Sequence, residues 1–242
     1  MRYGIFSDIH SNLEALEAVI RDYKKEGIDK YLCVGDIVGY ATNPGECIER
    51  VKALKMITIA GNHDWASVNL FSIDYFNPPA KKAVSWTQRN LDEEGRYLLE
   101  GLPLVYKNEY LTMAHGSLDE PGDFNYMTDG DIAFRTFELL ETDICFVGHT
   151  HVPGVFVKSE NNHIRYRKDN NADIKEDCKY IINVGSVGQP RDGNPMAAYC
   201  IYDTEKKNVQ IKRISYDTRA TRQKIINEGL PRFFGERLLI GR

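Results

Sequence analysis

Five of the six histidines lie in short polar motifs that could bind metal ions. The motifs are DIH at 8–10, GNHD at 61–64, AHG at 114–116 and GHTH at 148–151, and GDIVGY at 35–40 adds Asp36. Imidazole nitrogens and carboxylate oxygens are ligands for cations such as Zn, Mn, Fe or Co. Two such cations about 3.5 to 4 Å apart are a recurring device for hydrolysing phosphate esters. The sequence therefore predicts a binuclear metal centre.

Two motifs carry paired ligands at positions i and i+2. Asp8 with His10, and His149 with His151, would point to one face of an extended backbone. Each pair could then present two ligands to one cavity from a strand end. A histidine-rich surface turn is the alternative for either pair alone, but two pairs together with GNHD and AHG favour the metal site.

Asp36 follows an apolar strand and precedes a glycine-bearing turn. Its two carboxylate oxygens could bridge two cations. Gly35 and Gly39 favour a special turn that carries this side chain into a crowded site, whereas a helix cap is the alternative for an isolated Asp.

The GNHD motif offers a further ligand and a candidate catalytic group. The amide oxygen of Asn62 is a reasonable ligand for a hard cation, and the neighbouring Asp64 could hold the imidazole of His63 in one tautomer. The alternative is that Asn62 forms a turn and His63 lies on the surface.

Residues 183–193, NVGSVGQPRDG, contain three glycines. Their backbone amides could form an anion-binding concavity, with Arg191 as a forked donor to phosphate oxygens; a tight β-turn is the equal alternative. The sixth histidine, His163, lies in a hairpin away from the motifs and is expected to be an ordinary surface residue.

Composition limits the class of protein. A chain of 242 residues with 42% hydrophobic content can bury one full core, so a single domain over 1–242 is expected. The net charge of −4 disfavours stable nucleic-acid binding but not small phosphorylated partners such as nucleotides. Five widely spaced cysteines without a CxxC pair indicate reduced thiols. No leader or membrane-spanning run is seen, so a cytoplasmic protein is expected, and the oligomeric state stays open.

The elements that must position these motifs begin with a βαβαβ pattern. Strands are expected at 3–6, 31–34 and 56–59, with helices from residue 13 and from Pro44. Each strand ends in a polar motif, and ligands gather at the carboxyl ends of strands in open α/β sheets. We therefore expect the motifs to converge at one edge of a largely parallel sheet.

The rest of the chain is less regular. Residues 65–79 are expected to form an irregular insertion near the mouth of the site, 161–179 an exposed loop, and 217–242 a helical tail packed through Phe233, Phe234, Leu238 and Leu239. Helices are expected at 79–90, 92–99 and 129–140. Strands are expected at 104–106, 110–114, 144–147, 155–158, 164–167, 180–184, 197–202 and 209–214.

Taken in order, D-x-H, GDxxG, GNHD, HG and GHTH resemble the motifs of the calcineurin-like metallophosphoesterase superfamily, and the chain looks like its small prokaryotic phosphodiesterase branch. The motifs run from Asp8 to His151, and the GSVGQPRDG loop extends the similarity to Gly193. The ordered set is far more specific than any one motif. The resemblance implies an α/β fold of two packed mixed β-sheets flanked by helices, a four-layer α/β/β/α sandwich.

The resemblance also implies roles for individual residues. The first metal ion would be bound by Asp8, His10 and His151, the second by Asn62, His115 and His149, and both by Asp36. His63 matches the catalytic histidine of the family, with Asp64 orienting it. The expected cofactors are two divalent metal ions, with manganese favoured and Fe, Zn, Co or Ni as alternatives.

The expected reaction is hydrolysis of phosphodiester or nucleotide phosphoanhydride bonds by a metal-bridging hydroxide. Asn62 and Arg191 would bind the phosphate oxygens, and His63 would protonate or hydrogen-bond the departing oxygen. A phosphomonoesterase or protein phosphatase is one alternative, and a noncatalytic interaction module on the same fold is another. The chain departs from the family pattern after Trp65, in the acidic stretch 119–131 and in the tail, which leaves the substrate open.

Overall fold

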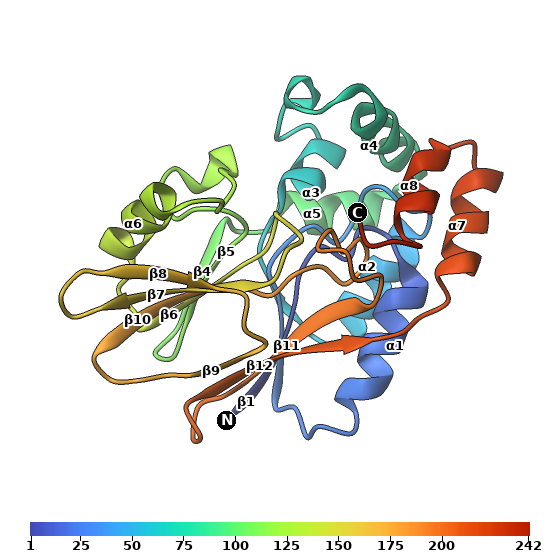
Figure 1. Ribbon diagram of the computed structural model, residues 1–242. Coiled ribbons are helices and arrows are strands. Elements are labelled where there is room, and N and C mark those ends of the chain that lie inside the picture. Colours follow the sequence, from blue (N-terminus) through green and yellow to red (C-terminus); the bar gives the residue numbers. More distant parts are fainter.

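The computed structural model describes all 242 residues and contains two six-stranded mixed sheets with helices on their outer sides (Figure 1). The first sheet has the order β3 (Ile57–Thr58), β2 (Lys30–Cys33), β1 (Arg2–Phe6), β11 (Ala197–Asp203), β12 (Asn208–Ile214) and β9 (Asn171–Asp173). The second has the order β4 (Val105–Lys107), β5 (Thr112–Ala114), β6 (Ile144–Val147), β10 (Cys178–Asn183), β7 (Gly154–Ser159) and β8 (Ile164–Arg167). The predicted fold class is confirmed.

The first sheet is less parallel than expected. Strands β3, β2 and β1 are parallel, as the βαβαβ pattern requires, but β11, β12 and β9 add to β1 in antiparallel fashion. The return of the chain from the second sheet supplies these three strands, and periodicity along the sequence does not reveal which strands pair. The expectation of a largely parallel sheet was therefore wrong.

The helices begin where local signals place them. The side chain of Asn12 caps α1 (Leu13–Tyr23) by accepting from the Ala15 amide, and Pro44 lies in the first turn of α2 (Pro44–Ala53). The remaining helices are α3 (Asn62–Ser67), α4 (Pro78–Asn90), α5 (Glu93–Glu100), α6 (Gly130–Leu139), α7 (Thr218–Asn227) and α8 (Arg232–Arg237). None of them combines the length and apolar character that crossing a membrane requires.

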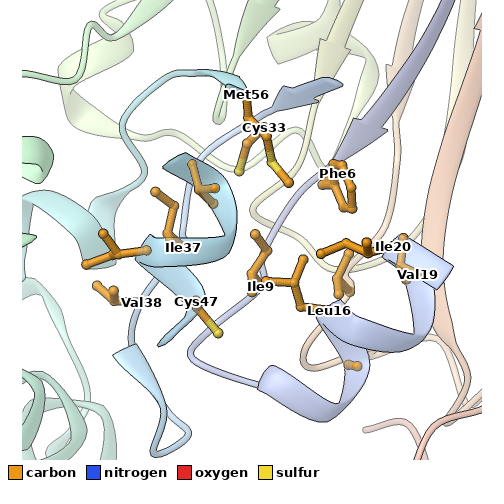
Figure 2. Close-up of a cluster of buried hydrophobic side chains, with 14 of the residues drawn as sticks. Phe6, Ile9, Leu16, Val19, Ile20, Cys33, Ile37, Val38, Cys47 and Met56 are labelled. Atoms are coloured by element: carbon orange, nitrogen blue, oxygen red, sulfur yellow. The ribbon is translucent and has the colours of Figure 1, made fainter. Parts of the chain in front are cut away.

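Alternating side chains of the strands divide the core into layers. Tyr3 and Ile5 of β1 pack between the two sheets, together with Ile144 and Phe146 of β6. Phe6 faces the other side, where Leu16 and Val19 of α1 cover the first sheet (Figure 2). A third cluster lies beneath α6 on the second sheet. These three apolar layers join the four layers of the sandwich.

Three local expectations were wrong. Residues 65–79 are not wholly irregular, because the end of α3 overlaps them and a short 3-10 helix (Ile73–Tyr75) lies within them. The expected loop 161–179 contains β9, which pairs with β12 and buries Ala172. In the tail, Phe234 and Leu238 are buried beside Tyr40, whereas Phe233 and Leu239 are largely exposed.

The cysteines and His163 lie as predicted. All five thiols are free, and four of them are buried. His163 is exposed in the turn between β7 and β8. This turn lies at the opposite end of β7 from the GHTH motif. Neither feature adds a ligand to the predicted metal centre.

Candidate metal centre

The polar motifs converge where strands of both sheets end. Loops after β1, β2, β5 and β6, together with the start of α3, carry the seven residues predicted as ligands: Asp8, His10, Asp36, Asn62, His115, His149 and His151. All seven are buried, with none more than 7% exposed. The convergence predicted for the first sheet is therefore found, and the second sheet contributes the remaining three residues.

Left-handed backbone, not extended strand, brings the paired residues together. Asp8 and His10 have φ of 53° and 50°, and His149 and His151 have φ of 65° and 61°. Non-glycine residues rarely adopt this conformation, which clusters at functional sites. The expectation that strand alternation presents each pair was wrong, because the strands end before these residues and tight turns aim the side chains.

Asp36 also lies in a left-handed turn, with φ of 55°, as its flanking glycines predicted. A Cβ on Gly35 would lie 2.8 Å from Nδ1 of His115, so this position requires glycine. One carboxylate oxygen of Asp36, Oδ1, accepts from the backbone amide of His63 at 2.8 Å. The other, Oδ2, lies 3.3 Å from Nε2 of His115 and 3.5 Å from Nε2 of His10.

The ligating atoms form overlapping groups of the size that a cation needs. Asp8, His10 and His151 form one group, and Asp36, His115 and His149 form another, each with candidate ligand atoms within 4.8 Å of one another. Nε2 of His151 lies 3.1 Å from Oδ1 of Asp8. A third group contains His10, Asp36 and His63, so Asp36 belongs to two of the three.

Backbone carbonyls fix the orientation of three imidazoles. Nδ1 of His10 lies 3.1 Å from the Val38 carbonyl, Nδ1 of His115 lies 2.7 Å from that of Val34, and Nδ1 of His151 lies 2.6 Å from that of Gln189. Because a carbonyl oxygen only accepts, each Nδ1 must donate. In the neutral form of each ring, Nε2 then carries a lone pair directed into the centre, which is the arrangement of metal-binding histidines.

Several buried polar atoms in the centre have no hydrogen-bond partner within the protein. They are Oδ1 of Asp8, Oδ2 of Asp36, Oδ1 of Asn62 and Nε2 of His115. Buried polar atoms are normally paired, and unpaired ones mark a ligand, ion or water site. The donors and their arrangement fit divalent cations, which carboxylate, amide oxygen and imidazole nitrogen bind together.

The charges of the centre suit cation binding. Burial opposes ionisation of Asp8 and Asp36, but the surrounding histidines hold the pKa of both carboxyl groups below its usual value. Burial lowers the pKa of His63 and His149 well below normal and, together with the charge of Arg191, lowers that of His151 to about 3. His115 differs: burial opposes its charge, but Asp36 and Asp8 raise its pKa to about 9, so this imidazole must release its proton to bind a metal, whereas the ionised carboxylates are already in the metal-binding form.

His63 is held by aromatic rings and not by Asp64. Its ring centroid lies 4.3 Å from that of Tyr40 and 4.8 Å from that of Phe76, and its Nδ1 has no hydrogen-bond partner. The Asp64 carboxylate instead accepts from the backbone amides of Val38 and Gly61, each at 3.1 Å. The predicted bond between Asp64 and His63 was therefore wrong, because Asp64 caps α3 and ties it to the loop after β2.

Replacing Asp64 by Ala should destabilise the fold. Two buried amides would lose their acceptor, at a cost of about 1–3 kcal/mol each. Chemical denaturation of the variant should show this loss in the free energy of unfolding. Asp74→Ala is the matched control, because Asp74 is exposed and pairs only with Lys81 at the surface, and its effect should stay within about 0.5 kcal/mol. Equal stability of the two variants would contradict the structural role of Asp64.

The loop at 183–193 does not form the anion-binding concavity that was one of its two interpretations. Its amides already donate within the protein: that of Val187 to the Ser7 carbonyl, that of Gly188 to the Asp8 carbonyl, and that of Gln189 to the Ser186 side chain. The loop instead supports the turn that carries Asp8. Arg191 does reach the site, where its guanidinium lies over the Tyr40 ring and donates to the Gln189 side chain.

Sequence reasoning missed two supporting residues. The Ser7 hydroxyl donates to Oδ2 of Asp8 at 2.7 Å, and its position beside Asp8 could have signalled this. Tyr126 stacks on His149 with ring centroids 3.8 Å apart. No local signal marks Tyr126, because it comes from a loop far along the chain from His149.

A pocket of about 280 Å³ opens onto the centre. Its polar lining includes Asp36, Asn62, His63, His149, His151 and Arg191. Small-molecule sites begin at roughly this size. A small phosphorylated molecule could thus reach the unpaired atoms of the centre.

This fold and this cluster of ligands are those of a metallophosphoesterase. A crystal structure of a metallophosphoesterase from Sphaerobacter thermophilus has a TM-score of 0.87 and 39% sequence identity, covering 100% of this chain and 99% of that one. The family model for the calcineurin-like phosphoesterase superfamily domain matches residues 1–207. The chain belongs to this superfamily of metal-dependent hydrolases of phosphate esters, which confirms the resemblance read from its motifs.

Two curated relatives extend over most of the chain. An uncharacterized protein of Methanocaldococcus jannaschii is 40% identical over 243 residues, covering 99% of this chain and 98% of the relative. Phosphodiesterase YfcE of Escherichia coli is 24% identical over 221 residues, covering 86% of this chain and 91% of the relative. The chain is thus an enzyme that acts on phosphate esters, as predicted.

Proposed function

We propose that the chain is a phosphodiesterase that uses two divalent metal ions to hydrolyse small phosphodiesters or nucleotide phosphoanhydrides. The observation that carries this proposal is the set of buried, unpaired oxygen and nitrogen atoms at Asp8, Asp36, Asn62 and His115. In this proposal Asp8, His10 and His151 hold one ion, Asn62, His115 and His149 the other, and Asp36 both. The similarity to phosphodiesterase YfcE supports the substrate class.

The ions would supply charge that draws in a phosphate and lower the pKa of a water molecule so that it acts as nucleophile. The protein side chains then orient the ester. Asn62 and Arg191 line one pocket with the ligands, so both can donate to the phosphate oxygens. Since the Gln189 side chain already orients the Arg191 guanidinium, this donor is held in place before substrate binds.

His63 would act on the departing oxygen as a neutral hydrogen-bond donor. Its pKa is lowered by burial, and the nearby His10 and Arg191 lower it further, so the ring is uncharged at neutral pH. Of the two roles expected from the sequence, protonation and hydrogen bonding, the structure favours the second. The contacts with Tyr40 and Phe76 would keep the His63 ring at the pocket wall during hydrolysis of the ester.

Metal removal tests the proposed function. The protein is stripped with a chelator and its metal content measured by mass spectrometry. Hydrolysis of bis(p-nitrophenyl) phosphate should fall to background and return when Mn²⁺ is added, with about two ions bound per chain. Zn²⁺, Fe²⁺, Co²⁺ and Ni²⁺ are tested in parallel to rank the metals.

A comparison of substrates separates the proposed phosphodiesterase from its alternatives. Faster hydrolysis of bis(p-nitrophenyl) phosphate than of p-nitrophenyl phosphate supports a phosphodiesterase, whereas the reverse order indicates a phosphomonoesterase. Full activity in the chelated protein would contradict metal dependence. Absence of hydrolysis with every metal and both substrates would favour the noncatalytic alternative.

A further inference from the structure

Two of the three segments in which the sequence departs from the family pattern form walls of the pocket. Residues between α3 and α4 contribute Phe71, Tyr75 and Phe76, and residues before α6 contribute Phe124 and Tyr126. The segments are about fifty residues apart in the sequence and meet over the metal centre. Segments outside the family motifs therefore line the pocket beside the candidate metal ligands.

The aromatic walls are packed against each other and against the centre. The ring of Phe71 meets that of Phe124 edge-on, with centroids 5.1 Å apart and planes at 89°. Phe124 in turn lies edge-on to His115, at 5.9 Å. These contacts hold the walls at a fixed position relative to the candidate metal ligands.

Two rings in the walls nevertheless remain open to solvent. Tyr75 is 80% exposed and Tyr126 is 48% exposed, although both line the pocket. Tyr75 stacks on Phe71 through one face only. An aromatic ring that is exposed beside a polar site offers a flat surface on which a planar group can stack. Every nucleobase has such a flat face, so stacking on an aromatic side chain does not depend on which base is present.

We propose that this aromatic pocket binds the nucleobase of a nucleotide whose phosphate reacts at the metal centre. The inference rests on the proposed phosphodiesterase function and names the class of its substrate. The polar side chains of Asn77, Asp123 and Asn125 lie at the rim of the pocket, where they can pair with the edge of a base. The negative charge of the Asp123 carboxylate disfavours a second phosphate in this aromatic part of the pocket.

The size of the pocket agrees with a nucleotide. A volume of about 280 Å³ lies near the lower end of the range for small-molecule sites, which suits one planar base with its sugar phosphate. The base should contribute to affinity independently of the phosphate, because different residues bind the two groups.

A pair of matched ligands tests the inference. Adenosine 5'-monophosphate and ribose 5-phosphate share the sugar phosphate and differ in the base. Titration calorimetry on the Mn²⁺-loaded enzyme should show that adenosine 5'-monophosphate binds about 10-fold or more tightly, which is the usual gain from stacking a base on an aromatic ring. Inhibition of bis(p-nitrophenyl) phosphate hydrolysis should follow the same order.

Variants of Tyr75 test the stacking itself. Tyr75→Ala and Tyr75→Leu should both remove most of the preference for adenosine 5'-monophosphate, since leucine restores apolar bulk but not a flat ring. Binding of ribose 5-phosphate should stay unchanged. Tyr97→Ala is the matched control, because Tyr97 is 81% exposed and does not line the pocket, and it should keep the full preference.

Two results would overturn the inference while leaving the proposed function intact. One is equal binding of the two ligands by an enzyme that hydrolyses bis(p-nitrophenyl) phosphate. The other is a preference for adenosine 5'-monophosphate that survives both Tyr75 variants. Failure of the proposed function is a different result, in which the metal-loaded protein hydrolyses neither nitrophenyl substrate.

Discussion

Asp36→Asn should abolish hydrolysis and metal binding together. The amide of Asn can still accept from the His63 backbone through one oxygen, so the turn is preserved. The variant loses the negative charge and the oxygen that faces His10 and His115. Mutation of residues that merely support metal ligands costs 10–100-fold in affinity or activity, so loss of a group shared by two ions should cost more than about 100-fold.

Metal content and thermal unfolding measure this effect without relying on turnover. Mn²⁺ should raise the melting temperature of the natural protein, because a ligand that binds only the folded state stabilises it. It should have little effect on the Asp36→Asn variant. The control is Asp131→Asn, an exposed residue in the first turn of α6. If Asp36→Asn bound two ions per chain as tightly as the natural protein, Asp36 would not be the shared ligand.

His63→Ala should reduce turnover by about 10²–10³-fold while the metal content is unchanged. This is the usual cost of removing one hydrogen-bond donor to an oxygen on which negative charge develops. His63→Gln should recover part of the loss, because its amide is also a neutral donor. Steady-state kinetics with bis(p-nitrophenyl) phosphate and metal analysis of the same samples give the two quantities.

The metal content of the His63 variants also decides between two arrangements. His63 forms a group with His10 and Asp36 that is close enough to hold an ion. If His63→Ala lost metal in step with activity, His63 would be a ligand and not the group that acts on the departing oxygen. His163→Ala, which changes an exposed histidine remote from the motifs, should affect neither quantity.

Most elements could be predicted because their signals are local. Helix α1 follows from a repeat of apolar residues, and α2 from Pro44 at its first turn. Helix α3 was missed because its six residues are too few to display a period and its sequence is dominated by the GNHD motif. Strand β9 was missed for a similar reason, since Ala172 is its only buried residue and its pairing partner β12 lies far along the chain.

The sequence by itself determined the chemistry, because ligand type is a property of each side chain. Its motifs identified all seven residues that meet in the centre and the family to which the chain belongs. Only the tertiary structure decided how these groups are held. The left-handed turns at Asp8 and His149, the pairing of Asp64 with Val38 and Gly61, and the aromatic pocket all depend on contacts between distant segments. Such contacts are set by packing across the whole molecule, which no local pattern of residues records.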